Sequence, residues 1–140
     1  MTFAKRVFVG AGVWGILSVT PLYFLFETIG RQNRMPITYP QFYYGFLAVT
    51  LAWQLAFIVI GSDPKRYRPL MIAGMVEKFG FIATIGLLYL QGRVTATDVL
   101  VVSPDCLLGI LFVIAFTKTS AAALHDNMSL GASGPSAVRP

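Results

Sequence analysis

Residues 7–26 read VFVGAGVWGILSVTPLYFLF, twenty consecutive residues that carry no charge between Arg6 and Glu27. The hydrocarbon core of a bilayer is about 30 Å thick, and a helix needs about 20 residues to cross it. Twenty apolar residues are more than the ~7–15 of a secretory signal peptide, and no clear cleavage site follows them. The stretch therefore predicts a retained transmembrane helix.

Three more apolar stretches of similar length follow, and they predict spans at about 41–61, 70–90 and 99–117. Of the 140 residues, 56% are hydrophobic and only 12% are charged, about half the charged fraction of a soluble domain. This composition excludes a disordered chain, a disulfide scaffold and an ordinary soluble enzyme. We predict an all-α polytopic membrane protein, in which residues 1–120 form an antiparallel bundle of four transmembrane helices.

The distribution of basic residues predicts how the bundle is oriented. With the N terminus inside, seven basic residues lie on the cytoplasmic side and three outside. The seven are Lys5, Arg6, Lys65, Arg66, Arg68, Lys118 and Arg139, and the three are Arg31, Arg34 and Arg93. The positive-inside rule then places both termini in the cytoplasm. Residues 121–140 are expected to form a flexible cytoplasmic tail, because their end is small and polar.

A polar cluster is predicted inside the membrane around Glu77, in the third span. Glu77 lies about 10 Å below the inner boundary, and Gln54 and Trp14 reach the same depth on their own helices. An ionised and unpaired acid in hydrocarbon costs several kcal/mol, so Glu77 should be protonated, paired or hydrated. We expect Gln54 as its neighbour, with one or both indoles, Trp14 and Trp53, as a wall.

Asp105, in the fourth span, permits two interpretations. Ser103-Pro104-Asp105 is typical of a helix start, but we favour a continuous helix that is kinked or broken at Pro104. Asp105 then lies about 10 Å below the outer face, on the other side of the midplane from Glu77 and too far from it for a paired-carboxylate site. Lys78 points about 100° away from Glu77 and is expected to snorkel to the inner surface.

Small residues in two spans predict close helix packing. Gly10, Gly12 and Gly15 spell G-x-G-x-x-G, but a dinucleotide site needs a strand before the glycines and a βαβ unit around them. Inside an apolar span, small residues instead let neighbouring helices approach, and Ala11 and Gly15, four residues apart, are one such pair. A second predicted seam consists of Gly45, Ala48, Ala52 and Ala56.

The sequence contains few residues that could form a disulfide, a metal site or a cofactor site. The single cysteine, Cys106, cannot form a disulfide or an iron–sulfur site within one chain, and the single histidine, His125, lies in the predicted tail. We therefore predict no catalytic residue, no metal site and no cofactor. Three basic residues of the loop at 62–69 are expected to contact lipid headgroups as well as to set the topology; they are Lys65, Arg66 and Arg68.

Several short motifs carry a resemblance to known proteins. They are Tyr44-Gly45-Phe46, Ala52-Trp53-Gln54, Asp63-Pro64, Arg66-Tyr67-Arg68-Pro69, Glu77-Lys78, Gly92-Arg93 and Asp105. In this combination the chain resembles, over residues 7–118, a group of uncharacterised small bacterial membrane proteins that are similar in layout to DoxX-like proteins. The resemblance implies a four-helix bundle in a bacterial inner membrane. It implies no established activity, so no catalytic residue is carried over.

The sequence favours the first of three functions and leaves the other two as alternatives. The first is a non-enzymatic accessory or lipid-interacting bundle, with membrane lipids, a second copy of the chain or another membrane subunit as partners and no role for nucleic acid. The second is a binding protein or enzyme for an apolar small molecule (a lipid, a sterol-like molecule or a quinone) in a pocket around Glu77. The third is a proton-coupled transporter. A tightly packed interior would favour the first, and a pocket of several hundred Å³ that reaches Glu77 would favour the second.

Overall fold

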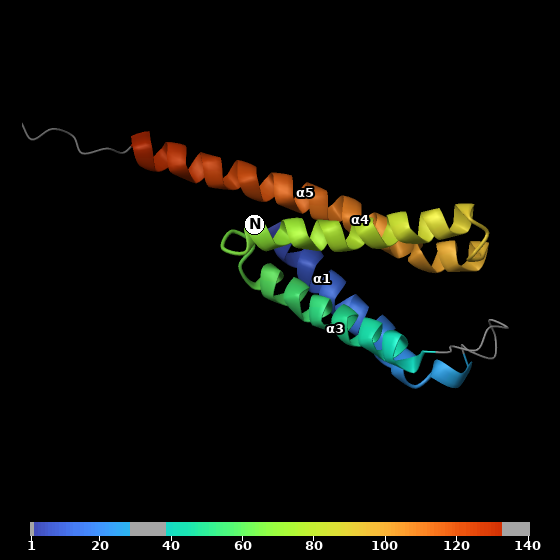
Figure 1. The fold of residues 1–140 in the computed structure, drawn as a ribbon. Helices are drawn as coiled ribbons and strands as arrows, with labels where there is room; N and C mark the ends of the chain where they lie inside the picture. Colours follow the sequence, from blue (N-terminus) through green and yellow to red (C-terminus); the bar gives the residue numbers. More distant parts are fainter. Residues whose placement is uncertain (1, 29–38, 133–140) are drawn as a thin grey trace, which may run out of the picture.

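The computed structural model describes residues 2–28 and 39–132, with side chains up to Thr119. Its long helices are α1 (Thr2–Val19), extended by the 3₁₀ turn η1 (Thr20–Tyr23), α3 (Pro40–Ser62), α4 (Arg68–Leu90) and α5 (Ala96–Ala132) (Figure 1). Each of the four is long and apolar enough to cross a membrane, and no strand occurs among the described residues. The predicted class, an all-α protein with four membrane-spanning helices, is confirmed. The side of the membrane that each end faces is still a prediction.

The helices begin and end where local chemistry dictates. Thr95 and Asp98 form a reciprocal cap before α5, since the Thr95 backbone N–H donates to Asp98 Oδ2 (2.7 Å) and the Asp98 N–H to Thr95 Oγ1 (3.4 Å). After α4, Gly92 adopts a positive φ of 68°. There the Arg93 N–H bonds the Leu88 carbonyl at 2.9 Å, closing the helix in a Schellman motif.

The first helix begins earlier and ends earlier than the predicted span of 7–26. It starts at Thr2, and its α-helical part ends at Val19. Pro21 lies in η1, where it lacks the N–H that an α-helix would need from it. The apolar run therefore crosses as an α-helix that tightens into a 3₁₀ turn, rather than as one uniform helix.

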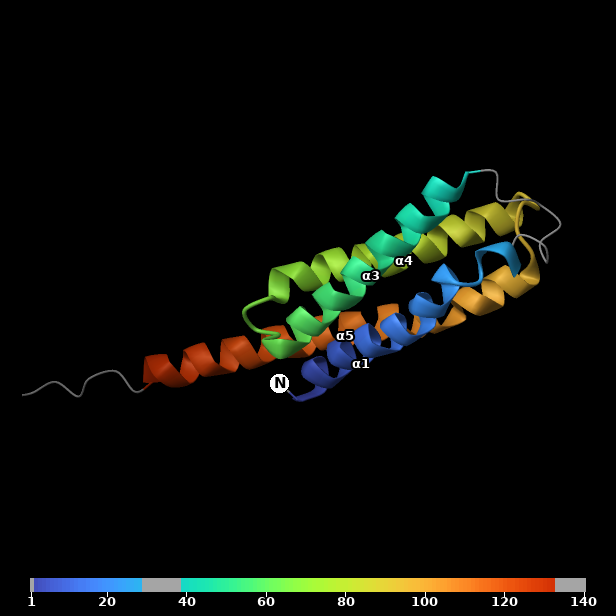
Figure 2. The ribbon, with the colours of Figure 1, turned by 90° about the horizontal axis from the view of Figure 1, so that it is seen from below.

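The fourth helix corrects one of the two interpretations of Asp105. It is assigned as a single helix from Ala96 to Ala132 with Pro104 inside it, so Ser103 does not begin a helix. The Ser103 hydroxyl instead donates to the Leu100 carbonyl at 2.7 Å. The helix also continues past the predicted boundary at 117, through an alanine-rich stretch with high helix propensity, and it projects beyond the other three (Figures 1 and 2). The flexibility of 121–140 is untested, and residues 133–140 lie outside the described part.

The four helices form two antiparallel pairs (Figures 1 and 2). The first helix pair is α1 with α3 and the second helix pair is α4 with α5, and packing is most extensive within these pairs. Between the pairs, α1 packs on α5, whereas α3 and α4 touch much less. The pairs meet at the end that holds the N terminus and diverge toward the other end (Figure 1).

Three phenylalanines form the centre of the core where the pairs meet. Phe8, Phe57 and Phe112 are fully buried. The Phe8 and Phe112 rings stack with centroids 4.2 Å apart, and Phe57 meets Phe112 edge-on at 5.0 Å. These rings join α1, α3 and α5 at one end only, which leaves space between the pairs toward the other end.

Glycines allow the close approach of α1 to α3. A methyl group added to Gly12 would lie 2.6 Å from the Gln54 backbone oxygen, and one added to Gly15 would overlap the Gln54 side chain. Gly10, on the same helix, would meet nothing within 4 Å. This confirms that Gly12 and Gly15 serve helix packing.

The predicted small-residue seam on α3 is wrong. Gly45, Ala48 and Ala52 are exposed and Ala56 is only half-buried, whereas α3 buries Leu47, Gln54, Phe57 and Ile60. The reason is complementarity, because the small residues at this interface belong mainly to α1. A glycine surface is best filled by larger side chains from its partner.

Candidate binding site

A cavity of about 630 Å³ lies between the two helix pairs, on the side where they diverge. Its walls come from α1, η1, α3, α4 and α5, and most of its lining side chains are apolar. All four residues of the predicted polar cluster line this cavity, namely Trp14, Trp53, Gln54 and Glu77, and Asp105 lines it as well. The interior of the bundle is therefore hollow at the depth where its polar residues gather.

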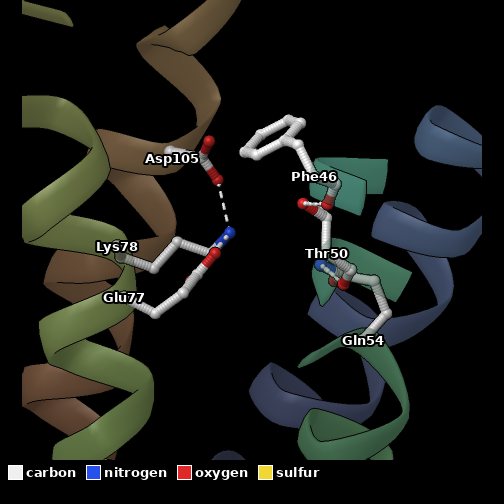
Figure 3. A network of polar contacts seen from close by, with 6 residues as sticks. All are labelled: Phe46, Thr50, Gln54, Glu77, Lys78 and Asp105. Atoms are coloured by element: carbon white, nitrogen blue, oxygen red, sulfur yellow. Dashed lines mark hydrogen bonds and ion pairs between the residues drawn. The ribbon is translucent and has the colours of Figure 1, made fainter. Parts of the chain in front are cut away.

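One wall of the cavity carries three charged side chains, which we call the charged trio: Glu77 and Lys78 from α4, and Asp105 from α5 (Figure 3). Lys78 Nζ lies 2.7 Å from Asp105 Oδ1 and 3.4 Å from Glu77 Oε2. It also lies 5.5 Å from the centre of the Phe57 ring. Since only 6% of Lys78 is exposed, the expectation that it snorkels to the inner surface is wrong. The Lys78 side chain instead reaches the Asp105 carboxylate on α5.

The charged trio also corrects the predicted separation of the two acids. Glu77 and Asp105 share Lys78 as a partner instead of lying too far apart to interact. Counted from the turn that joins their helices, Lys78 is 12 residues before Leu90 and Asp105 is 9 residues after Ala96. At 1.5 Å per residue these positions differ in height by only about 4 Å, which a lysine side chain spans.

Glu77 is the member of the trio with unused bonding capacity. Its side chain is 20% exposed, and its Oε2 is buried without a hydrogen-bond partner among the described residues. Lys78 Nζ, the nearest cation, lies closer to Asp105. The ion pair of Glu77 with Lys78 supplies charge but no hydrogen bond, so this buried oxygen favours a hydrogen-bond donor that enters the cavity.

The opposite wall is formed by α3 and presents an amide. The Gln54 side-chain amide donates to the Thr50 carbonyl at 3.1 Å, and the Thr50 hydroxyl donates to the Phe46 carbonyl at 2.8 Å. Gln54 and Glu77 were expected to be neighbours, but they face each other across the cavity (Figure 3). No hydrogen bond joins them within the described structure, because the divergence of the helix pairs separates them.

Aromatic side chains supply much of the apolar lining. Trp14 and Trp53 line it from the first helix pair, with the Trp53 ring 5.9 Å from that of Phe57. Phe46 and Phe81 also line the cavity and stack at 5.9 Å, one from α3 and one from α4. These two rings bridge the side of the bundle where the helices touch least.

The loop between α3 and α4 holds its basic residues in different ways. The Arg68 guanidinium lies 3.9 Å above the Phe116 ring of α5, whereas Arg66 is exposed and its backbone N–H bonds Asp63 Oδ1 at 3.2 Å. Arg68 and Lys65 are half-buried, and Arg68 Nε is buried without a hydrogen-bond partner among the described residues, whereas Arg66 is exposed. Headgroup contact by this loop is still a prediction.

The described residues contain no group of three His, Cys, Asp or Glu side chains that could hold a metal ion. Comparisons of the chain with protein-family models, with curated proteins and with solved structures found no match. The resemblance to small DoxX-like bacterial membrane proteins therefore stays a prediction. The four helices long and apolar enough to cross a membrane define a polytopic integral membrane protein.

Proposed function

We propose that this protein binds an apolar small molecule, such as a lipid, a sterol-like molecule or a quinone, in the cavity between its two helix pairs. The observation that carries the proposal is a cavity of about 630 Å³ that reaches Glu77. Its volume falls within the ~300–1,000 Å³ typical of ligand sites. A bundle with only a packing role would be expected to fill this space.

The composition of the walls supports the same function. An apolar molecule in the cavity would gain dispersion contacts with its largely apolar lining. Ligand sites combine apolar walls with a few polar groups that fix orientation, and here those groups are the charged trio on one side and Gln54 on the other. Glu77 Oε2 is the acceptor toward which the polar end of a ligand would turn. We also propose that the protein lies in a bacterial inner membrane and that the ligand enters the cavity from the lipid phase of that membrane.

Tryptophan fluorescence gives a direct test, because the two tryptophans of the chain, Trp14 and Trp53, both line the cavity. The full chain in detergent micelles is titrated with a brominated fatty-acid methyl ester, a neutral apolar quencher. We expect saturable quenching with a defined Kd. Quenching that only increases in proportion to the quencher, as for a tryptophan in contact with bulk detergent, would contradict the proposal.

A matched pair of variants separates binding in the cavity from partition into the micelle. Val102 is 8% exposed and lines the cavity, so Val102→Phe should fill it and weaken saturable quenching at least tenfold. Val99, one turn earlier, is 38% exposed and does not line the cavity, so Val99→Phe should bind like the wild type. Equal binding by the two variants would place the ligand elsewhere. Thermal unfolding of both variants verifies that they are folded.

A further inference from the structure

The cavity is lined by one more acidic side chain than basic side chains. Its ionisable lining residues, within the described part of the chain, are Glu77, Lys78 and Asp105. When all three are ionised their charges sum to −1. Because an apolar and aromatic lining screens charge poorly, this surplus acts strongly on whatever enters.

The geometry assigns the surplus to Glu77. Lys78 Nζ is 2.7 Å from Asp105 and 3.4 Å from Glu77, so the tighter ion pair is the one with Asp105. Glu77 Oε2 is left buried without a hydrogen bond among the described residues. An anionic ligand would add to the negative charge, whereas a cationic ligand would neutralise it and complete the bonding of this oxygen.

The rest of the wall is also suited to a cation. Four aromatic side chains line the same cavity: Trp14, Phe46, Trp53 and Phe81. The faces of aromatic rings carry negative charge density and attract organic cations, and tryptophan attracts them most. Lys78 shows the same preference within the protein, since its Nζ lies 5.5 Å from the Phe57 ring centre.

We infer that the ligand is a lipophilic cation, an apolar body that carries an amine or ammonium group, with the charge next to the Glu77 carboxylate and the body against the aromatic walls. This inference rests on the proposed function and narrows its ligand class. It excludes fatty acids and other lipophilic anions as preferred ligands, because Lys78 already has two carboxylates as neighbours.

Three probes of similar size test the sign of the charge: tetraphenylphosphonium, the anion tetraphenylborate and the neutral triphenylphosphine oxide. Each is titrated separately into the full chain in neutral detergent micelles at neutral pH, with tryptophan quenching as the signal. We expect the cation to bind about tenfold more tightly than the neutral probe, the factor that one ionic or cation–π contact supplies. The anion should bind more weakly than the neutral probe. A neutral probe that binds as tightly as the cation would overturn the inference and leave the proposed function standing.

Two isosteric variants locate the charge preference. Glu77→Gln should abolish the tenfold preference for the cation and change the affinity for the neutral probe by less than twofold. Glu27→Gln removes the same charge from an exposed residue outside the cavity, so it should change neither the preference nor that affinity. Asp105→Asn should also reduce the preference, because Lys78 is then free to neutralise Glu77. An unchanged preference in Glu77→Gln would overturn the inference. Failure of every probe to bind the wild type would instead overturn the proposed function.

Discussion

Replacement of Lys78 by methionine removes the cation of the charged trio but keeps most of its apolar stem. Both carboxylates then lose their shared partner. Loss of one partner from a fully buried ion pair costs about 3–5 kcal/mol, whereas exposed pairs contribute about 0–1 kcal/mol. Here the side chains are 7% exposed for Lys78, 20% for Glu77 and 24% for Asp105. The acids can also take up a proton, so we expect Lys78→Met to lower the free energy of unfolding by about 2 kcal/mol.

A double-mutant cycle isolates the contact between Lys78 and Asp105. The variants are Lys78→Met, Asp105→Asn and the two combined, and the assay is reversible unfolding by an anionic detergent in mixed micelles. At a distance of 2.7 Å between Nζ and Oδ1 we expect a coupling energy of about 1–2 kcal/mol, toward the upper end for polar contacts between membrane helices. Lys5→Met, at an exposed lysine in α1, is the matched control and should change stability by less than about 0.5 kcal/mol.

Two results would refute this account of Lys78. One is additivity of the two single substitutions to within about 0.3 kcal/mol, which would mean that the side chains do not interact. The other is a Lys78→Met variant as stable as Lys5→Met, which would mean that Lys78 is hydrated at the surface, as a snorkelling lysine would be.

Three further predictions address the bundle. Gly12→Ala should destabilise the bundle by about 1–3 kcal/mol in the same unfolding assay, because the new methyl group would lie 2.6 Å from a backbone oxygen of α3. Gly10→Ala is the control and should cost nothing, since a methyl group there meets nothing within 4 Å. Equal effects of the two substitutions would contradict the close contact at Gly12. Thr95→Ala removes the hydroxyl that accepts from the Asp98 N–H at the start of α5 and should cost about 1 kcal/mol, with faster amide exchange confined to the first turn of that helix. Topology reporters inserted in the 62–69 loop and after Lys118 should report the same side of the membrane. Lys118 Nζ lies 4.5 Å from the centre of the Phe3 ring at the start of α1, and the loop lies at the same end of the bundle (Figure 1).

The number and class of the helices could be predicted from the sequence, because charged residues interrupt the apolar stretches at intervals matched to a bilayer. This pattern depends only on the order of apolar and charged residues along the chain, and it does not require knowledge of how the helices pack. The interpretation of Gly12 and Gly15 also succeeded, since a long apolar span leaves no strand for a nucleotide-binding turn. Helix ends were less predictable. Pro21 lies in a 3₁₀ turn within the first predicted span, and α5 continues beyond Thr117.

The partners inside the bundle could not be predicted, because depth and facing direction were counted separately for each helix. Counting along a single helix locates Glu77 from the inner boundary and Asp105 from the outer one, so a shift of one helical turn at either end decides whether the two acids meet. Lys78 was oriented by its own helix alone. The sequence feature that could have indicated its partner is the long lysine side chain, because such a side chain can reach an acid on a neighbouring helix at nearly the same height. The cavity has no sequence signal of its own, since it follows from the divergence of two helix pairs.

Each transmembrane helix pairs with the span next to it in the sequence, and this affects how the chain inserts into the membrane. Both helix pairs consist of successive spans, so each pair can assemble as soon as its second member leaves the ribosome. Asp105 follows Lys78 by 27 residues, which at ~5–20 residues per second is a delay of about 1 to 5 s. During that interval Lys78 has left the ribosome with Glu77 as the only acid of the trio that has also emerged. A nascent chain arrested after α4 should therefore hold its third span less firmly, and a translocon or lipid phosphate near Lys78 would be needed until Asp105 arrives.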